Sequence, residues 1–231
     1  MRLKSQKGIL QDPRRGSFDS YLDGAPACPR DSLRQFQITP RRVAKRFVQS
    51  FFLVIVLPAA LVCGFGRLSS IYMFFAQAFA LAPGIPGNFL RSAFYSYVLR
   101  DCSIDTTIAF GTFFSRSDAS VGSNVSIGSY CVIGRAHIGA RTQISSHVEI
   151  PSGRYQHARD DLGRLLTSVD GEVRIGEDCW IGASAIVLAD VGVGTTVGAG
   201  SVVVKELPAR VVAAGNPARV IRFAADTEVR H

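Results

Sequence analysis

An aliphatic or aromatic residue recurs along the second half of this chain at a spacing close to six. From Ile104 to Ile150 most steps are six residues, one is five and one is eleven, and glycine directly follows many of the recurring positions. The fourth residue after each position is usually small or compact, as at Val125, Cys131, Thr142, Val148, Cys179, Ala185 and Ser201. The recurring positions are Ile104, Phe110, Val121, Ile127, Ile133, Ile138, Ile144, Ile150, Ile175, Ile181 and Val197.

This period of six excludes the common regular folds. An amphipathic helix repeats every 3.6 residues and a half-buried strand every two. Short strands joined by tight turns around a prism do repeat every six, with the aliphatic and the small residue pointing inward and glycine at the turns. Each coil buries its face only against its neighbours, so the coils must stack as a solenoid. We therefore predict a mainly β fold, a parallel β-helix over residues 101–223.

Two irregularities interrupt the repeat. Between Val187 and Val197 the two expected steps are short by two residues, which predicts a tightened corner and leaves the register of Val191 and Val193 open. Between Ile150 and Val173 the pattern stops altogether, in a polar stretch that contains His157. We predict that residues 151–172 form a loop released between two coils.

The N-terminal part has a different composition. Residues 1–46 hold eleven Lys and Arg against four Asp, about +7 of the net charge of +8, which favours attraction to a membrane surface. Residues 47–66 are apolar except for Gln49 and Ser50, and a second apolar stretch covers residues 68–87. Twenty helical residues rise about 30 Å, enough to cross a bilayer core.

Three arrangements of the apolar stretches are compatible with the sequence: a hairpin that enters and leaves on one side, two interfacial helices, or a buried helical pair packed on the main domain. We favour membrane association through residues 47–90, with Arg91 and Arg100 at its exit and Tyr95 and Tyr97 in the headgroup zone. The expected segments are a basic tail (1–46), an apolar helical segment (47–100), the β-helix (101–223) and a short tail (224–231). The five cysteines lack metal or CxxC spacing and indicate a reducing compartment.

The closing coils resemble a known family. The run "VRIGEDCWIGASAIVLADVGVGTTVGAGSVVVKELPARVVAAGNPARVIR", Val173–Arg222, is similar to the hexapeptide-repeat acyltransferases, and "GNPARVIR" is typical of their maltose and sugar acetyltransferase branch. Residues 83–157 also resemble bacterial exopolysaccharide and lipopolysaccharide acetyltransferases that carry an apolar N-terminal region. The resemblance implies a left-handed β-helix, a homotrimer with clefts between neighbouring solenoids, and acetyl-CoA as acyl donor.

Acetyl transfer to a hydroxyl needs a base, and histidine suits this role because its pKa lies near neutral pH. The family's base lies on or beside a loop ahead of an "IGxDxWIG" motif, and His157 matches that place; taken alone, it could equally be a solvated loop histidine. His231 is terminal, His137 could be a corner residue, and His147 should point outward and could line a groove. These histidines lack the ligand spacing of the zinc-dependent solenoid enzymes, so we expect no metal.

Further site residues follow from type and place. Asp160, Asp161 or Glu149 could orient the imidazole of His157, although solvated loop carboxylates are as good an account. For the saccharide we expect Arg154, Tyr155, Trp180 and His147 as binding residues. For acetyl-CoA we expect the small residues Ala183, Ala199 and Gly200 along the pantetheine arm, and Lys205, Arg219 and Arg222 at the phosphates.

These expectations combine into one hypothesis. The chain is an acetyl-CoA-dependent O-acetyltransferase that modifies a saccharide hydroxyl, on a glycan or a lipid-linked precursor, at the cytoplasmic face of the bacterial inner membrane. Two alternatives remain: an N-acetyltransferase acting on an amino sugar or a small xenobiotic, and a non-catalytic trimeric scaffold. No phosphate-binding glycine motif or basic aromatic patch points to nucleotide hydrolysis or nucleic acid.

Overall fold

The computed structural model describes residues 40–152, 164 and 171–223, with side chains from Lys45 onward. Three helices come first: α2 (Pro40–Val62), α3 (Ser69–Ala80) and α4 (Gly84–Val98). Short strands follow: β1 (Asp101–Cys102), β2 (Thr107–Ile108), β3 (Phe113–Phe114), β4 (Ser120–Val121), β5 (Ser126–Ile127), β6 (Val132–Ile133), β7 (Ala136–Ile138), β8 (Gln143–Ile144), β9 (Glu149–Ile150), β10 (Val173–Ile175), β11 (Trp180–Ile181), β12 (Ile186–Val187), β13 (Thr196–Val197), β14 (Val202–Val203), β15 (Val211–Ala214) and β16 (Arg219–Phe223).

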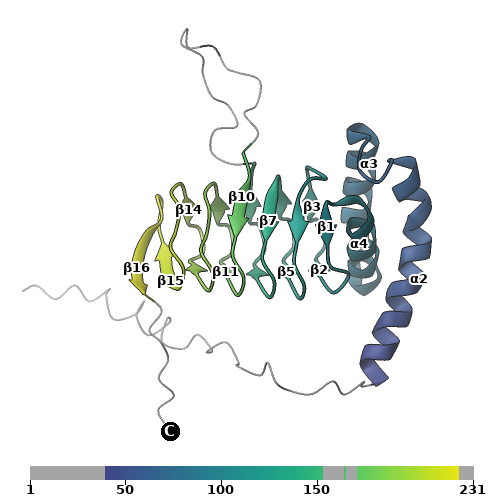
Figure 1. The fold of residues 1–231 in the computed structure, drawn as a ribbon, viewed down its shortest axis with the longest axis horizontal. Coiled ribbons are helices and arrows are strands. Elements are labelled where there is room, and N and C mark those ends of the chain that lie inside the picture. The colour runs from purple at the N-terminus through teal and green to yellow at the C-terminus, as the bar shows by residue number, and fades with distance from the viewer. Residues whose placement is uncertain (1–39, 153–163, 165–170, 224–231) are drawn as a thin grey trace, which may run out of the picture. The chain divides into compact units, whose positions relative to one another are not determined.

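The strands form the three faces of a solenoid (Figure 1). One face has the order β1-β4-β7-β10, the second β2-β5-β8-β11-β13-β15-β16, and the third β3-β6-β9-β12-β14. All neighbours are parallel except β15 and β16, which are antiparallel and close the C-terminal end. We call these the first, second and third faces. The predicted parallel β-solenoid is therefore confirmed, whereas its left hand remains an implication of the resemblance.

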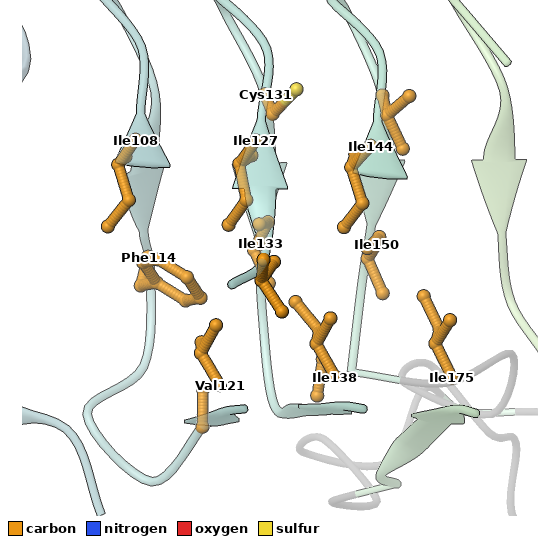
Figure 2. Close-up of a cluster of buried hydrophobic side chains, with 14 of the residues drawn as sticks. Ile108, Phe114, Val121, Ile127, Cys131, Ile133, Ile138, Ile144, Ile150 and Ile175 are labelled. Carbon is orange, nitrogen blue, oxygen red and sulfur yellow. The ribbon is translucent and has the colours of Figure 1, made fainter. Parts of the chain in front are cut away.

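The interior consists of three ladders of aliphatic side chains, one behind each face (Figure 2). Ile108, Ile127 and Ile144 form the ladder of the second face, and every member is at most 3% exposed. The predicted small positions are buried beside them, including both Cys131 and Cys179. Burial raises the pKa of both thiols, as expected for cysteine used as a small core residue.

The predicted phase of the repeat is wrong in the first coil. Cys102, Ile108 and Phe114 point inward, not Ile104 and Phe110. Phe110 is followed by glycine, as an inward position usually is, but the inward step from Phe114 to Val121 has seven residues, and counting back from Phe114 in sixes gives Ile108 and Cys102. Phe110 lies instead at a corner, where its ring meets the edge of Tyr130 at a centroid distance of 5.5 Å.

The tightened corner is confirmed and its register is now clear. Val191 is buried and bridges to Ile175 and Leu207 on the neighbouring coils, so it belongs to the first face. Val193 is 49% exposed and points outward. Only three residues separate Val187 from Val191 along the chain, which shortens the corner between the third and first faces.

The helices cover the N-terminal end of the solenoid, with α4 against the first coil and α2 outermost (Figure 1). This cap supplies hydrogen bonds to the open edge of the first coil, which has no preceding coil to pair with. Gln49 donates to the carbonyl of Ile104 at 2.9 Å, and Ser92 donates to that of Thr106 at 2.6 Å. Arg91 donates to the carbonyl of Ile108 and Tyr72 to that of Phe114, both at 2.8 Å. The cap is therefore an integral part of the fold.

This packing corrects the expected membrane exit. Arg91 is fully buried in the cap and Tyr95 is also fully buried, so neither lies in a headgroup zone. The second apolar stretch is divided between α3, of 12 residues, and the start of α4. Twelve helical residues rise only about 18 Å, too short for a crossing. Within the described residues, Lys45–Val62 of α2 is the one helix that meets the length and composition of a membrane span, with 22% of that window buried.

Candidate active site

The break in the repeat falls where the sequence predicts it. Between Ile150 of β9 and Val173 of β10 lie 22 residues, whereas two residues separate Ile133 of β6 from Ala136 of β7 at the equivalent corner. The coils nevertheless stack without interruption, because β10 pairs with β7 in register, Arg174 opposite His137. The segment therefore starts and returns at one corner, between the third and first faces. Of the residues predicted there, His157, Arg154, Tyr155, Asp160 and Asp161 lie outside the described residues.

A cleft of about 250 Å³ lies on the third face where the segment starts. Glu149, Pro151 and Ser152 line it from one coil, and Ser115 and Val132 from the coils before. Ser152 is 3% exposed, and its hydroxyl accepts a hydrogen bond of 2.9 Å from the backbone N–H of Arg135. The side chain of Glu149 points outward from β9, next to this cleft, as its proposed orienting role requires.

A second cleft, of about 330 Å³, lies on the first face where the segment returns. His137, Arg174 and Asp190 line it on successive coils. The sequence left open that His137 is a corner residue, but it lies in the middle of β7. Its Nδ1 is 2.5 Å from the hydroxyl of Ser120. Asp190 Oδ1 accepts the backbone N–H of Arg174 at 2.8 Å.

The corner between the second and third faces carries a column of rings. His147 is exposed, as predicted, in a left-handed turn with φ of 60°. Its ring stacks on Tyr130 of the preceding coil, at a centroid distance of 5.3 Å and an interplanar angle of 13°. The sequence did not single out Tyr130, although its place one coil before His147 could have indicated the stack. We call this edge the ring corner.

Trp180 reaches the same corner from β11. Its indole is 48% exposed, and its Nε1 donates to the hydroxyl of Ser145 at 3.3 Å. Ser145 lies two residues before His147 in the turn. The two predicted saccharide-binding residues Trp180 and His147 are thus brought to one edge. Ser145 was missed, because a serine in a turn has no distinctive sequence signal.

The ring corner continues into small residues on the later coils. The N–H of Gly200 donates to the carbonyl of Ala183 at 2.8 Å, which stacks the predicted pantetheine residues Ala183, Ala199 and Gly200 on adjacent coils. Gly200 has φ of 67°, and a Cβ placed there would meet no atom within 4 Å. The edge is therefore open at this point, and a slender chain could approach its backbone amides closely.

The predicted phosphate-binding cations lie beyond these coils. Lys205 is exposed in the turn after β14, while Arg219 and Arg222 are exposed on β16. Arg219 pairs with Ala214 and Arg222 with Val212, so both lie on the antiparallel closing strand. The three residues are near the C-terminal end, but no contact joins Lys205 to either arginine.

The inserted segment, which carries the expected base, and the ring corner belong to different edges of the solenoid. The expected base lies on the segment that starts and returns at the corner between the third and first faces, whereas the ring corner lies across the third face. In the part of the chain described here, no group of three His, Cys, Asp or Glu side chains forms a metal site. The arrangement thus offers a hydrogen-bonding, aromatic and small-residue edge of the kind an acyl transfer uses.

Comparison with known proteins gives local sequence matches. No protein-family model matches the chain. It is 43% identical over 79 residues to WcaF of Escherichia coli, provisionally named a colanic acid biosynthesis acetyltransferase, which covers 33% of this chain and 41% of that protein. It is 46% identical over 52 residues to a provisionally named acetyltransferase of Saccharomyces cerevisiae, 22% of this chain and 26% of that one. The chain thus spans less than half the length of these curated relatives.

Solved structures support the fold. A hexapeptide-repeat acetyltransferase of Vibrio cholerae matches with a TM-score of 0.60 over 71% of this chain and 92% of that one, at 17% identity. A maltose O-acetyltransferase of Clostridium difficile matches with a TM-score of 0.57 over 68% and 88%, at 22% identity. At these identities the likeness concerns the fold. Together with the sequence matches, it confirms the resemblance on which the candidate site was drawn.

Proposed function

We propose that this chain, which belongs by its repeat and its fold to the hexapeptide-repeat acetyltransferases, transfers an acetyl group from acetyl-CoA to a hydroxyl of a saccharide. The observation that carries the proposal is the single insertion in an otherwise continuous stack. The coils need no residues between β9 and β10 beyond a short corner, yet 22 separate Ile150 from Val173, and they include a histidine. A rigid scaffold that releases one such segment is typical of a positioned functional loop.

His157 acts as the general base. Its imidazole takes the proton of the acceptor hydroxyl while the hydroxyl oxygen attacks the thioester carbonyl carbon. The tetrahedral intermediate then collapses, the carbon–sulfur bond breaks, and the imidazolium returns the proton to the leaving thiolate. Glu149 points outward beside the start of the segment, and its carboxylate would hold the imidazole in the required tautomer.

The ring corner holds the acyl donor. Ala183, Ala199 and Gly200 leave the edge open, so the pantetheine arm can run along it and bond to backbone amides, and an amide of the same edge can stabilise the oxyanion. Lys205, Arg219 and Arg222 supply cations near the C-terminal end for the phosphates. Trp180 and His147 present ring faces on the neighbouring coils, which suit contact with a sugar.

We infer that the complete site forms between copies of the chain. The segment bearing His157 and the ring corner belong to different edges of one prism, separated by the third face. In a trimer of parallel solenoids, one copy's segment can face the next copy's ring corner, so that each site draws its walls from two chains. Loss of trimer would then abolish transfer without unfolding a protomer.

The acceptor class rests on the local similarity to WcaF, whose name refers to a polysaccharide. An acceptor attached to a lipid at the cytoplasmic face of the inner membrane fits the apolar N-terminal helices. Acetyl-CoA is a cytoplasmic metabolite, so the solenoid belongs on that side.

Transfer can be measured by release of free CoA thiol from acetyl-CoA in the presence of candidate acceptors, with mass spectrometry of the product. His157→Ala should reduce the rate about 100-fold or more, in line with loss of a general base, while the melting temperature stays unchanged. His231→Ala is the matched control, because it removes a histidine to which no role is assigned and should retain activity. Equal rates for His157→Ala and the unmodified chain would refute the role of His157. Products acetylated only on nitrogen would refute the hydroxyl acceptor.

A further inference from the structure

The outer face of α2 is apolar from Phe47 to Val62. We define this outer face as Phe47, Phe51, Val54, Ile55, Leu61 and Val62, which are 74, 63, 71, 47, 57 and 57% exposed. An α-helix turns by about 100° per residue, so these six positions fall within an arc of about 120° on one side of the helix. Ser50 is a polar neighbour, and its hydroxyl already donates to the carbonyl of Arg46.

α2 is apolar on both faces, unlike an amphipathic surface helix, because Val56 and Ala60 of its inner face are also fully buried in the core. Its inner face carries Gln49, which is 6% exposed and donates to the carbonyl of Ile104 at 2.9 Å. Its outer face carries the large apolar side chains. Apolar patches of this size on a monomer mark an interaction surface. The apolar surface also continues past the end of α2, through Phe65 and Leu68.

Both ends of α2 are fixed to the first coil of the solenoid. Near the N-terminal end, Lys45 pairs with Asp105 at 3.2 Å and Gln49 bonds to Ile104. Beyond the C-terminal end, the hydroxyl of Ser117 donates to the carbonyl of Gly66 at 2.9 Å. Ile104 and Ser117 belong to different corners of the same coil. The helix therefore lies across the end of the solenoid (Figure 1), and a crossing of the bilayer would require these contacts to break.

Charge distinguishes a membrane from a second copy as the occupant of the outer face. No Asp or Glu occurs between residues 45 and 100, whereas Lys45, Arg46 and Arg67 flank the two ends of the outer face. Pairing two copies through α2 would bring cations together with no carboxylate from the helices to compensate. Anionic headgroups at a bilayer surface would compensate them, and the acyl region would accept the apolar side chains.

We propose that α2 lies flat in the interface of a membrane that contains anionic phospholipid, with the outer face in the acyl boundary and the solenoid pointing away from it. The protein is then monotopic and does not cross the bilayer. This geometry concerns the cap alone and does not depend on the proposed acetyl transfer, so it is tested without acetyl-CoA.

The first test is flotation of the full chain with vesicles of phosphatidylcholine, with and without phosphatidylglycerol. We expect binding that is stronger with phosphatidylglycerol. The double variant Val54→Asp and Leu61→Asp should lower vesicle affinity at least about tenfold, because each side chain buried in an apolar phase is worth about that factor. The matched control is Val132→Asp with Val193→Asp, which changes exposed valines of the solenoid and should bind normally. Equal binding by both double variants, with unchanged melting temperatures, would overturn the proposal.

The second test distinguishes a flat helix from a crossing helix and from a dimer. Phe47→Cys, Val54→Cys and Leu61→Cys are labelled with an environment-sensitive dye in a Cys28→Ser background, since the other cysteines are buried. A flat helix gives the same shallow quenching depth for all three labels, and a label deepest at position 54 would show a crossing. Disulfide formation between copies through Val54→Cys that is equally efficient with and without vesicles would show that a second copy covers the face.

Discussion

Arg91 offers the sharpest test of how the cap is attached to the solenoid. Its side chain is fully buried, and its guanidinium donates to the carbonyls of Ile108, Phe79, Ala80 and Ala82 at 2.8, 3.0, 3.2 and 2.7 Å, and to Asn88 Oδ1 at 2.7 Å. Burial lowers its pKa, which shows that desolvation opposes the charge. The substitution Arg91→Met keeps the length of the side chain and removes every donor.

The expected loss can be worked out from the acceptors. The carbonyls of Phe79 and Ala80 also accept from the N–H groups of Ala82 and Gly111, so they keep a partner. Ile108 lies on the terminal strand of its sheet and Ala82 precedes α4, so these two carbonyls lose theirs. A buried polar group without a partner costs about 1–3 kcal/mol. Because the substitution also relieves the desolvation cost of a buried charge, we expect a net loss in the free energy of unfolding of about 3 kcal/mol.

Urea denaturation followed by circular dichroism measures this loss. With a denaturant slope of roughly 2 kcal/mol per molar, the midpoint should fall by about 1.5 M. Arg67→Met is the control, because it removes the same charge from an exposed turn and should leave the midpoint unchanged. A midpoint for Arg91→Met equal to or above that of the unmodified chain would refute the reasoning, because desolvation of the charge would then outweigh its hydrogen bonds.

Three further predictions concern the solenoid. Gly139→Ala would place a Cβ 2.5 Å from the backbone of Glu177 and Gly176 on the next coil, so thermal melting should show a loss of about 1–3 kcal/mol or more, and an unchanged melting temperature would contradict the stacking. Burial raises the pKa of Cys131 and Cys179, and that of Cys102 to about 12. In a Cys28→Ser variant, a thiol reagent at pH 8 should therefore label no cysteine rapidly until denaturant is added. Fast labelling of the folded chain would disprove this. A hydrogen bond from Arg141 lowers the pKa of Asp178, so the pair stabilises the fold above the unfolded pKa of about 3.9 and loses this effect as pH falls through the lowered value. Asp178→Asn should therefore cost about 0.5 kcal/mol at pH 7 and less at pH 2, and an equal cost at both would exclude the ion pair.

The repeat made most of the solenoid predictable. From Val121 to Ile150 the inward positions agree with the sequence, because a residue that must face a closed core allows no other phase. The first coil was misplaced, since a seven-residue step near Phe114 shifts the count and nothing in the chain marks it. The cap corresponds to the buried helical pair that the sequence left open as an alternative, but its contacts with the first coil could not be predicted. Arg91 in an apolar stretch reads as a flanking cation, and only the open carbonyls of the first coil explain its burial.

The candidate site was predictable in part. The place of the inserted segment followed from the pause in the repeat. The contact of Trp180 with Ser145 and the stack of His147 on Tyr130 join residues of successive coils. Such contacts depend on which corner each residue occupies, and a period of six alone does not distinguish one corner of a prism from another. The role of His157 stays a prediction.

If α2 lies flat on the membrane, the number of coils sets the distance between the membrane and the inserted segment. If α2 rests on the membrane, α4 adds a layer of about 8–10 Å, and each coil adds about 4.8 Å. The inserted segment starts on the third coil, at β9, so its start stands roughly 24 Å from the axis of α2 by these spacings. A sugar attached directly to a lipid headgroup would lie well below that level. The number of coils between the cap and the segment would thus select acceptors whose chains extend several sugars out from the bilayer. Deleting one coil would bring the segment closer to the membrane by about 4.8 Å.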